Sequence, residues 1–110
     1  MKAWEICNDD LRLHDVGTAH SREGETVVRV SHVGICGSDL PKLLRPNSFP
    51  LPAPWRPGHE IVGIDPTGRA VAVDPLVPCG NCPRCTTGDT HLCAGLRRLG
   101  WERAPGARRC

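Results

Sequence analysis

Large aromatic side chains are scarce in this chain, whose 110 residues include three tryptophans, one phenylalanine and no tyrosine. A chain of this length forms one domain at most, and its hydrophobic core is modest. No apolar run approaches the roughly 20 residues that a membrane-spanning helix needs, so we expect no membrane partner. The opening sequence MKAWEICNDD lacks the apolar segment of a signal peptide, which predicts a cytoplasmic location.

The chain also lacks a nucleotide-binding signature. It has no G-x-G-x-x-G sequence, no P-loop and no alternation of strand and helix, so we expect the Rossmann domain to be absent. Helix-forming stretches are few, whereas 11 prolines and 12 glycines supply turns, which predicts mainly β structure. The net charge is only +2, and no aromatic residues interleave the C-terminal arginines, so we expect no nucleic-acid partner.

The hydrophobic pattern predicts short strands and one short helix. The strands are expected at Lys2–Cys7, Leu11–Asp15, Glu25–Val33, Glu60–Asp65 and Arg69–Asp74. Valines on both faces of Glu25–Val33 indicate a central strand rather than an edge strand. Ser38 or Asp39 is expected to cap a helix over residues 40–44. Five prolines between residues 45 and 57 predict a surface loop without regular structure.

Cysteine, in contrast, is concentrated in one short stretch. The run CGNCPRCTTGDTHLC has the spacing C-x2-C-x2-C-x7-C and contains Cys79, Cys82, Cys85 and Cys93. Four thiolates surround one tetrahedral zinc, and C-x2-C lets one tight turn present two sulfurs to the same metal. Disulfides have less support because nothing indicates an oxidising compartment. An iron–sulfur cluster usually has a different fourth spacing, so we expect a structural zinc without an open position.

Two further turns carry side chains that bind metals. Cys36 lies in GICGSD, and His59 and Glu60 lie in PGHE. A thiolate, an imidazole and a carboxylate form the mixed ligand set of a zinc that keeps one position open. Ser38 offers a hydroxyl near this thiolate, and Asp39 is placed to hold the imidazole from behind. Taken singly, Cys36 is as readily a core residue and His59 a hydrogen-bonded histidine, so both alternatives stay open.

The order of these motifs resembles that of a known family. GICGSDLP (34–41), PGHEIVG (57–63), VAVDPLVPC (71–79) and the four-cysteine segment resemble the zinc-containing alcohol dehydrogenases of the medium-chain dehydrogenase/reductase family. The similarity is greatest to the branch that oxidises polyols and sugar alcohols. It implies a mainly β fold, a GroES-like, partly open β-barrel with a zinc-bound four-cysteine lobe. This incomplete domain would span residues 1–102, followed by an irregular tail at 103–110.

The resemblance also implies roles for individual residues. Cys36, His59 and Glu60 would hold a catalytic zinc, Ser38 would take the proton of the substrate hydroxyl, and Asp39 would support His59. The four cysteines of the lobe would hold a structural zinc. The implied reaction is the oxidation of a small alcohol or polyol to a ketone or aldehyde with NAD or NADP, and the full-length parent enzyme is expected to form a homo-oligomer. We expect this chain to be an N-terminal fragment of such an enzyme, inactive alone; a non-catalytic zinc-binding module is the alternative.

Overall fold

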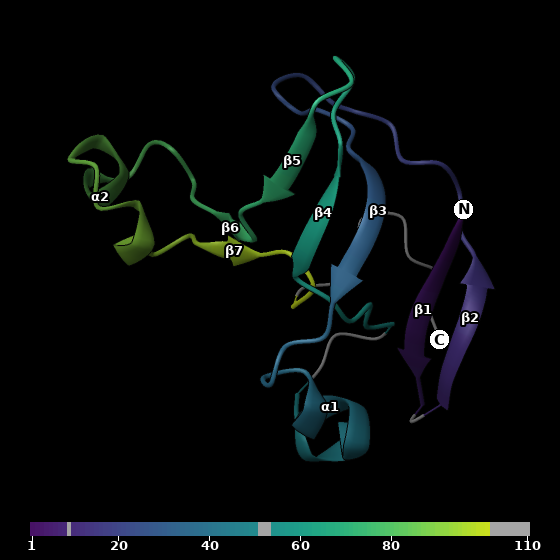
Figure 1. The fold of residues 1–110 in the computed structure, drawn as a ribbon. Helices are drawn as coiled ribbons and strands as arrows, with labels where there is room; N and C mark the ends of the chain where they lie inside the picture. Colours follow the sequence, from purple (N-terminus) through teal and green to yellow (C-terminus); the bar gives the residue numbers. More distant parts are fainter. Residues whose placement is uncertain (9, 51–53, 102–110) are drawn as a thin grey trace.

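The computed structural model describes residues 1–8, 10–50 and 54–101. Strands dominate these residues, and they form three small antiparallel sheets with no closed barrel among them (Figure 1). The first sheet pairs β1 (Lys2–Cys7) with β2 (Asp10–Asp15), the second has the order β3 (Arg29–Gly34), β4 (Glu60–Ile64) and β5 (Ala70–Val73), and the third pairs β6 (Leu76–Val77) with β7 (Arg97–Arg98). The prediction of a mainly β chain is confirmed.

Two short α-helices and two 3-10 turns complete the described structure. They are α1 (Leu40–Leu44), η1 (Pro46–Ser48), α2 (Pro83–Thr86) and η2 (Thr90–Leu92). The turn η1 corrects the prediction that residues 45–57 carry no regular structure. No helix in the described part of the chain has the length and apolar character needed to cross a bilayer. The tail predicted at residues 103–110 lies outside the described residues.

The three-stranded sheet differs from its prediction in one respect. The strand expected at Glu25–Val33 begins only at Arg29, and among the described strands it pairs with β4 alone. It is therefore an edge strand of this sheet, and the prediction of a central strand is wrong. Val30 and Val33 are about half exposed, so the valine pattern does not correspond to a strand buried on both faces here.

The hairpin between β4 and β5 closes through a turn at residues 65–68. The backbone N–H of Gly68 donates to the carbonyl of Asp65 at 3.0 Å, and Gly68 has a φ of +89°, which favours glycine. The carboxylate of Asp65 accepts hydrogen bonds from the backbone N–H groups of Thr67 and Arg69. The hydroxyl of Thr67 also donates to this carboxylate, and it makes the largest contribution to lowering the pKa of Asp65 below its ordinary value. The backbone donors lower this pKa further.

A small core joins the β1–β2 hairpin to the rest of the chain. Trp55 is 1% exposed, and its backbone pairs with Ile6 through hydrogen bonds of 2.8 and 3.0 Å. Beside this bridge, the guanidinium of Arg56 donates to the carboxylate of Glu5 at 2.6 Å. With so few large apolar residues, Trp55 is the main buried side chain around which the segments meet.

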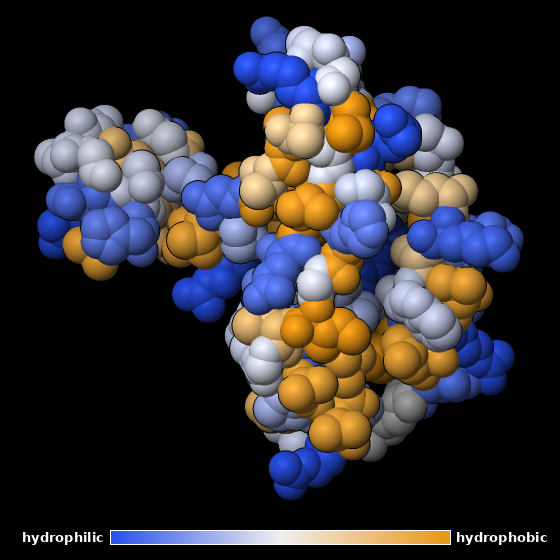
Figure 2. Space-filling model, viewed as in Figure 1, coloured by the Kyte–Doolittle hydropathy of each residue, from blue (hydrophilic) through white to orange (hydrophobic). Residues whose placement is uncertain are grey.

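The helix α1 follows β3 along the chain and leaves much of its apolar surface exposed. Leu40 and Leu44 of α1 are exposed, as is Ile35 in the segment before it, and Figure 2 shows apolar side chains gathered over α1 on this face. Asp39 occupies the N-cap position, but its side chain makes no capping hydrogen bond. The predicted cap is therefore absent, because the Asp39 carboxylate is directed to other partners described below.

Candidate metal centres

The four cysteines converge in a lobe that projects from β6 and β7 (Figure 1). The sulfur of Cys85 lies 3.5 Å from that of Cys82 and 3.9 Å from that of Cys79. A zinc with four sulfurs at about 2.3 Å has an edge between sulfurs of about 3.8 Å. All four cysteines are free thiols, so the structure does not support the disulfide alternative for this cluster. The sulfur positions therefore fit a single tetrahedral ion.

Backbone turns within the lobe aim these sulfurs inward. Gly80 and Gly88 have φ values of +79° and +90°, which residues other than glycine rarely adopt. Cys93 is buried, and its sulfur accepts the backbone N–H of Cys79 at 3.4 Å. This contact joins the two ends of the cysteine run across 14 residues.

The thiols of Cys82 and Cys85 differ in acidity. The backbone N–H and the thiol of Cys85 stabilise the Cys82 thiolate and lower the pKa of Cys82 to about 6. Partial burial, together with the neighbouring Cys82, raises the pKa of Cys85 to about 12. At neutral pH Cys82 is therefore ionised and ready to bind a cation, whereas Cys85 gives up its proton to an incoming metal.

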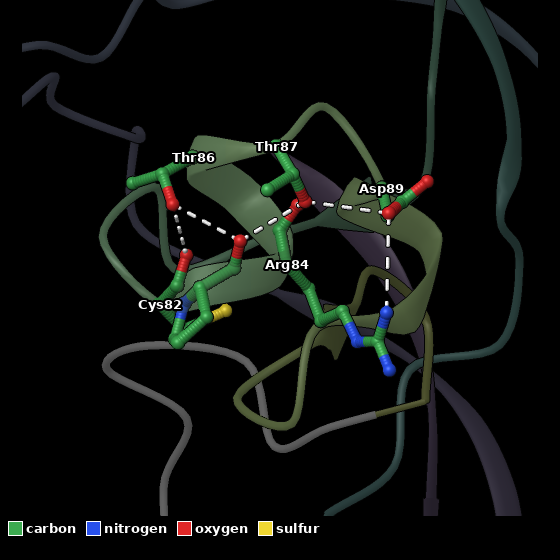
Figure 3. A network of polar contacts seen from close by, with 6 residues as sticks. Cys82, Arg84, Thr86, Thr87 and Asp89 are labelled. Atoms are coloured by element: carbon green, nitrogen blue, oxygen red, sulfur yellow. Dashed lines mark hydrogen bonds and ion pairs between the residues drawn. The ribbon is translucent and has the colours of Figure 1, made fainter.

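A polar network holds the outer turn of the lobe (Figure 3). The hydroxyl of Thr86 donates to the backbone carbonyls of Cys82 and Pro83, and that of Thr87 donates to the carbonyl of Pro83. Thr87 also donates to the carboxylate of Asp89 at 3.3 Å, and Arg84 lies 4.0 Å from the same carboxylate. The side chains that order this turn thus come from inside the lobe itself.

The second centre lies where β3 ends and β4 begins. One candidate ligand atom each from Cys36, His59 and Glu60 lies within 4.8 Å of the other two. Glu60 stands opposite Gly34 in the β3–β4 register. A Cβ atom at Gly34 would collide with the Glu60 carboxylate, so the glycine leaves room for that side chain at the site. The structure thus brings together the three residues predicted to form this centre.

Asp39 contacts two of the three residues of this centre, Cys36 and His59. Its side chain is 1% exposed, and its Oδ2 accepts the backbone N–H of Cys36 at 3.0 Å. Its Oδ1 faces Nδ1 of His59 at 3.4 Å, and both of these buried atoms lack a hydrogen bond with good geometry among the described residues. A small rotation of the imidazole would complete an Nδ1–H donation to Asp39. Nε2 of His59 is then left for a metal.

Ser38 lies on the turn between Cys36 and α1, with an exposed side chain. Its carbonyl accepts a hydrogen bond of 2.9 Å from Nζ of Lys42, a residue that is itself buried. The turn that carries Ser38 is therefore held by a buried lysine, while Ser38 itself is exposed to solvent.

Sequence reasoning missed two residues beside this centre, Lys42 and Trp101. The indole of Trp101 meets the His59 imidazole edge to face, with ring centroids 6.3 Å apart, and Nζ of Lys42 lies 3.3 Å from the Trp101 centroid. The one signal for Trp101 was a large aromatic residue in an otherwise polar segment. Nothing in the spacing of Lys42 indicates that it is buried.

The donor sets of both centres suit zinc. Four thiolates without an oxygen donor are typical of a closed structural site. The thiolate, imidazole and carboxylate set leaves a coordination position free, and a buried carboxylate behind the histidine is the usual support of such a ligand. No other group of three or more metal-binding side chains converges within the described residues.

Comparisons with known proteins give a consistent picture. The profile of the alcohol dehydrogenase GroES-like domain family matches residues 22–109. Among curated proteins, 2-dehydro-3-deoxy-L-galactonate 5-dehydrogenase of Pseudoalteromonas atlantica is 36% identical, with 76% of this chain and 27% of the relative covered. Galactitol 1-phosphate 5-dehydrogenase of Escherichia coli K12 is 35% identical over the same shares of the two chains.

Solved structures agree with this result. Galactitol-1-phosphate dehydrogenase from Escherichia coli superimposes with a TM-score of 0.81 at 30% identity, covering 99% of this chain and 34% of that one. A short chain alcohol dehydrogenase from E. coli CFT073, complexed with NADH, gives 0.79 at 32% identity and covers 97% and 34%. The cobalt- and zinc-bound alcohol dehydrogenase from Pyrobaculum aerophilum gives 0.75 at 26% identity and covers 93% and 35%.

The extent of these matches is itself informative. The chain spans only about a third or less of the length of the curated relatives and structures above. The strands β3 to β7, the four-cysteine lobe and the second cluster of ligands all fall inside residues 22–109, which the family profile matches, whereas β1 and β2 precede that range.

Proposed function

Because the chain belongs to the alcohol dehydrogenase GroES-like domain family, we propose that it is the N-terminal catalytic part of a zinc-dependent dehydrogenase. The enzyme would oxidise a small alcohol or polyol to a ketone or aldehyde with NAD or NADP. The observation that carries this proposal is the convergence of Cys36, His59 and Glu60 within 4.8 Å, backed by a buried Asp39. The polyol class rests on relatives such as galactitol 1-phosphate 5-dehydrogenase.

Each residue of the open site has a distinct task in this proposal. Cys36, His59 and Glu60 would hold the zinc, and Asp39 would keep His59 in the tautomer that presents Nε2. When bound, zinc supplies Lewis acidity toward the substrate oxygen, and the nicotinamide supplies the hydride acceptor. Ser38 Oγ would accept the proton of the substrate hydroxyl and pass its own proton to water. Proline stands at position 41, where a histidine would be needed to extend this relay.

The structural zinc has a different task. Cys79, Cys82, Cys85 and Cys93 leave no position for a substrate, so their zinc would order the lobe and take no part in the reaction. Residues 1–102 would form the incomplete domain, and 103–110 its irregular tail. A cytoplasmic location and a homo-oligomeric parent enzyme remain predictions.

The proposal is tested by extending the coding sequence. The DNA beyond the Cys110 codon would be read in all three frames, and the longest product purified with zinc. We expect a frame that continues into a glycine-rich βαβ unit, whose product reduces NAD or NADP with polyols. The Cys36→Ser variant of that product should be inactive. A continuation that carries no nucleotide-binding unit, or a product without dehydrogenase activity, would overturn the proposal.

A second candidate function is a non-catalytic zinc-binding module. The observation that favours it is the cluster of four thiols, whose donor set forms a closed zinc site with no position for a substrate. It predicts that all three frames end soon after Cys110 and that the 110-residue chain binds zinc but oxidises no alcohol. The same sequencing experiment therefore separates the two candidates.

A further inference from the structure

Lys42 is a charged residue in an unusual position. It is 5% exposed, and Nζ lies 3.3 Å from the ring centroid of Trp101 and 5.9 Å from that of Trp55. Its only hydrogen bond among the described residues goes to the carbonyl of Ser38. A buried ammonium group is stable only where other groups replace its water, and two indole rings with one carbonyl fill that role here.

Trp101 is held in this position from its backbone. The carbonyl of Gly100 accepts a hydrogen bond of 2.6 Å from the indole of Trp55. Gly100 has a φ of +75°, and a Cβ atom there would collide with the carbonyl of Gly58. The backbone before Trp101 therefore lies directly on the turn that carries His59, which sets the indole against the imidazole.

The imidazole of His59 is thus confined on two sides. The carboxylate of Asp39 faces its Nδ1 at 3.4 Å, and the edge of Trp101 meets its ring at an interplanar angle of 60°. Asp39 selects the tautomer, whereas Trp101 restricts the rotation of the ring. Because Nδ1 faces Asp39, Nε2 is the nitrogen left available for a metal shared with Cys36 and Glu60.

We propose that Lys42 and Trp101 are positioning residues for the metal site of Cys36, His59 and Glu60. Lys42 binds Trp101 through its charge and the Ser38 turn through its hydrogen bond, so one side chain fixes the wall behind His59 and the loop that carries Cys36. Trp101 transmits this support to the imidazole by direct contact. The inference rests on the proposed metal site but concerns two residues outside its ligand set.

The test is a titration of the metal-free 110-residue chain with Co²⁺, followed by visible and near-ultraviolet absorption. The unsubstituted 110-residue chain, called the parent chain below, should bind two Co²⁺ ions. Cys36→Ser should remove only the absorption bands of cobalt at the open site. Lys42→Met and Trp101→Leu should weaken cobalt at the open site about tenfold and change its visible bands, the lower end of the effect known for residues that support ligands. The cobalt bands of the four-cysteine lobe should stay unchanged.

Matched variants separate positioning from a general effect on folding. Lys2→Met and Trp4→Leu alter an exposed lysine and an exposed tryptophan and should leave both cobalt sites intact. Trp101→Phe keeps an aromatic ring under Lys42 and should retain most of the affinity that Trp101→Leu loses. In nuclear magnetic resonance spectra of the metal-free chain, Trp101→Leu should also shift the His59 ring protons, because the ring current of the indole is lost.

The outcomes distinguish the inference from the proposed function. If the parent chain binds no cobalt at the open site, both are overturned. If it binds cobalt there, and Lys42→Met and Trp101→Leu leave the affinity and the bands unchanged, only the positioning role is overturned. If both variants lose affinity at the lobe as strongly as at the open site, the two residues act on the whole fold, and the positioning role is likewise rejected.

Discussion

The two metal centres differ in where their supports come from. In the four-cysteine lobe, the ligands and the side chains that order the turns all lie between Cys79 and Cys93, whose contact spans 14 residues. The open site depends on contacts between distant segments, such as the bond from Trp55 to Gly100 across 45 residues. The geometry of the lobe therefore depends on its own short sequence, whereas the geometry of the open site is lost when any one of its long-range contacts is lost.

The largest test of this contrast removes one ligand of the lobe. Cys82→Ser should release the structural zinc and abolish amide-exchange protection across residues 79–93, because a structural zinc contributes about 10–16 kcal/mol in small zinc-finger peptides. Hydrogen exchange measured by mass spectrometry checks this expectation. Cys36→Ser is the control and should leave that segment protected. Unchanged protection in the zinc-free lobe would contradict the view that metal orders it.

A glycine pair compares the backbone of the two regions. Gly88→Ala in the lobe meets no neighbouring atom, so only its positive φ opposes it, at about 1–2 kcal/mol. Gly100→Ala adds a collision with Gly58, which should cost about another 1–3 kcal/mol of unfolding free energy. Urea denaturation followed by tryptophan fluorescence measures both. Equal losses of unfolding free energy in the two variants would show that the close contact between Gly100 and Gly58 does not affect stability.

A third change acts on the buried carboxylate behind the open site. Asp39→Asn removes the charge but keeps the shape, and it should weaken cobalt at that site about 10- to 100-fold while the lobe keeps its affinity. Asp89→Asn in the lobe is the matched control and should affect neither site by more than about twofold. Undiminished affinity in Asp39→Asn would mean that the carboxylate does not support His59.

The smallest expected effect concerns a turn that belongs to neither centre. The pKa of Asp65 is lowered, so its ionised form stabilises the fold above the ordinary pKa of 3.8, and that stabilisation is lost as the pH falls through the lowered value. Asp65→Asn should therefore be less stable than the parent chain at pH 7 and nearly equal to it at pH 2. Urea denaturation of both chains at the two pH values checks the sign. A difference that grows on acidification would contradict it.

The sequence was sufficient for the lobe because its ligands and the turns that present them lie in the same short segment. Cys82 and Cys85 are fixed by their spacing and by the glycines around them, and the structure gathers all four sulfurs. For the open site, Cys36 and His59 were ambiguous as single residues. Their assignment depended on the ordered resemblance to a family, and their convergence depends on a strand pairing that no local pattern predicts.

Other features could not be derived from local patterns. The valines of β3 predicted a central strand, yet Val30 and Val33 are half exposed in the described structure, because a strand pattern does not say which partners are present. Asp39 was expected as a possible cap, but its carboxylate accepts the backbone N–H of Cys36 and faces His59 instead of capping α1. Lys42 and Trp101 meet only through the tertiary fold.

The contact between Gly100 and Gly58 also has a consequence for the order in which the parts of the open site are translated. All three ligands of the open site have been made once Glu60 is added, but the indole behind His59 arrives only with Trp101. At about 5–20 residues per second, a ribosome takes roughly 2 to 8 seconds to cover that interval. The four cysteines are all added within it. The ligands of the later-encoded centre are therefore all translated before the indole that contacts His59 in the earlier-encoded one.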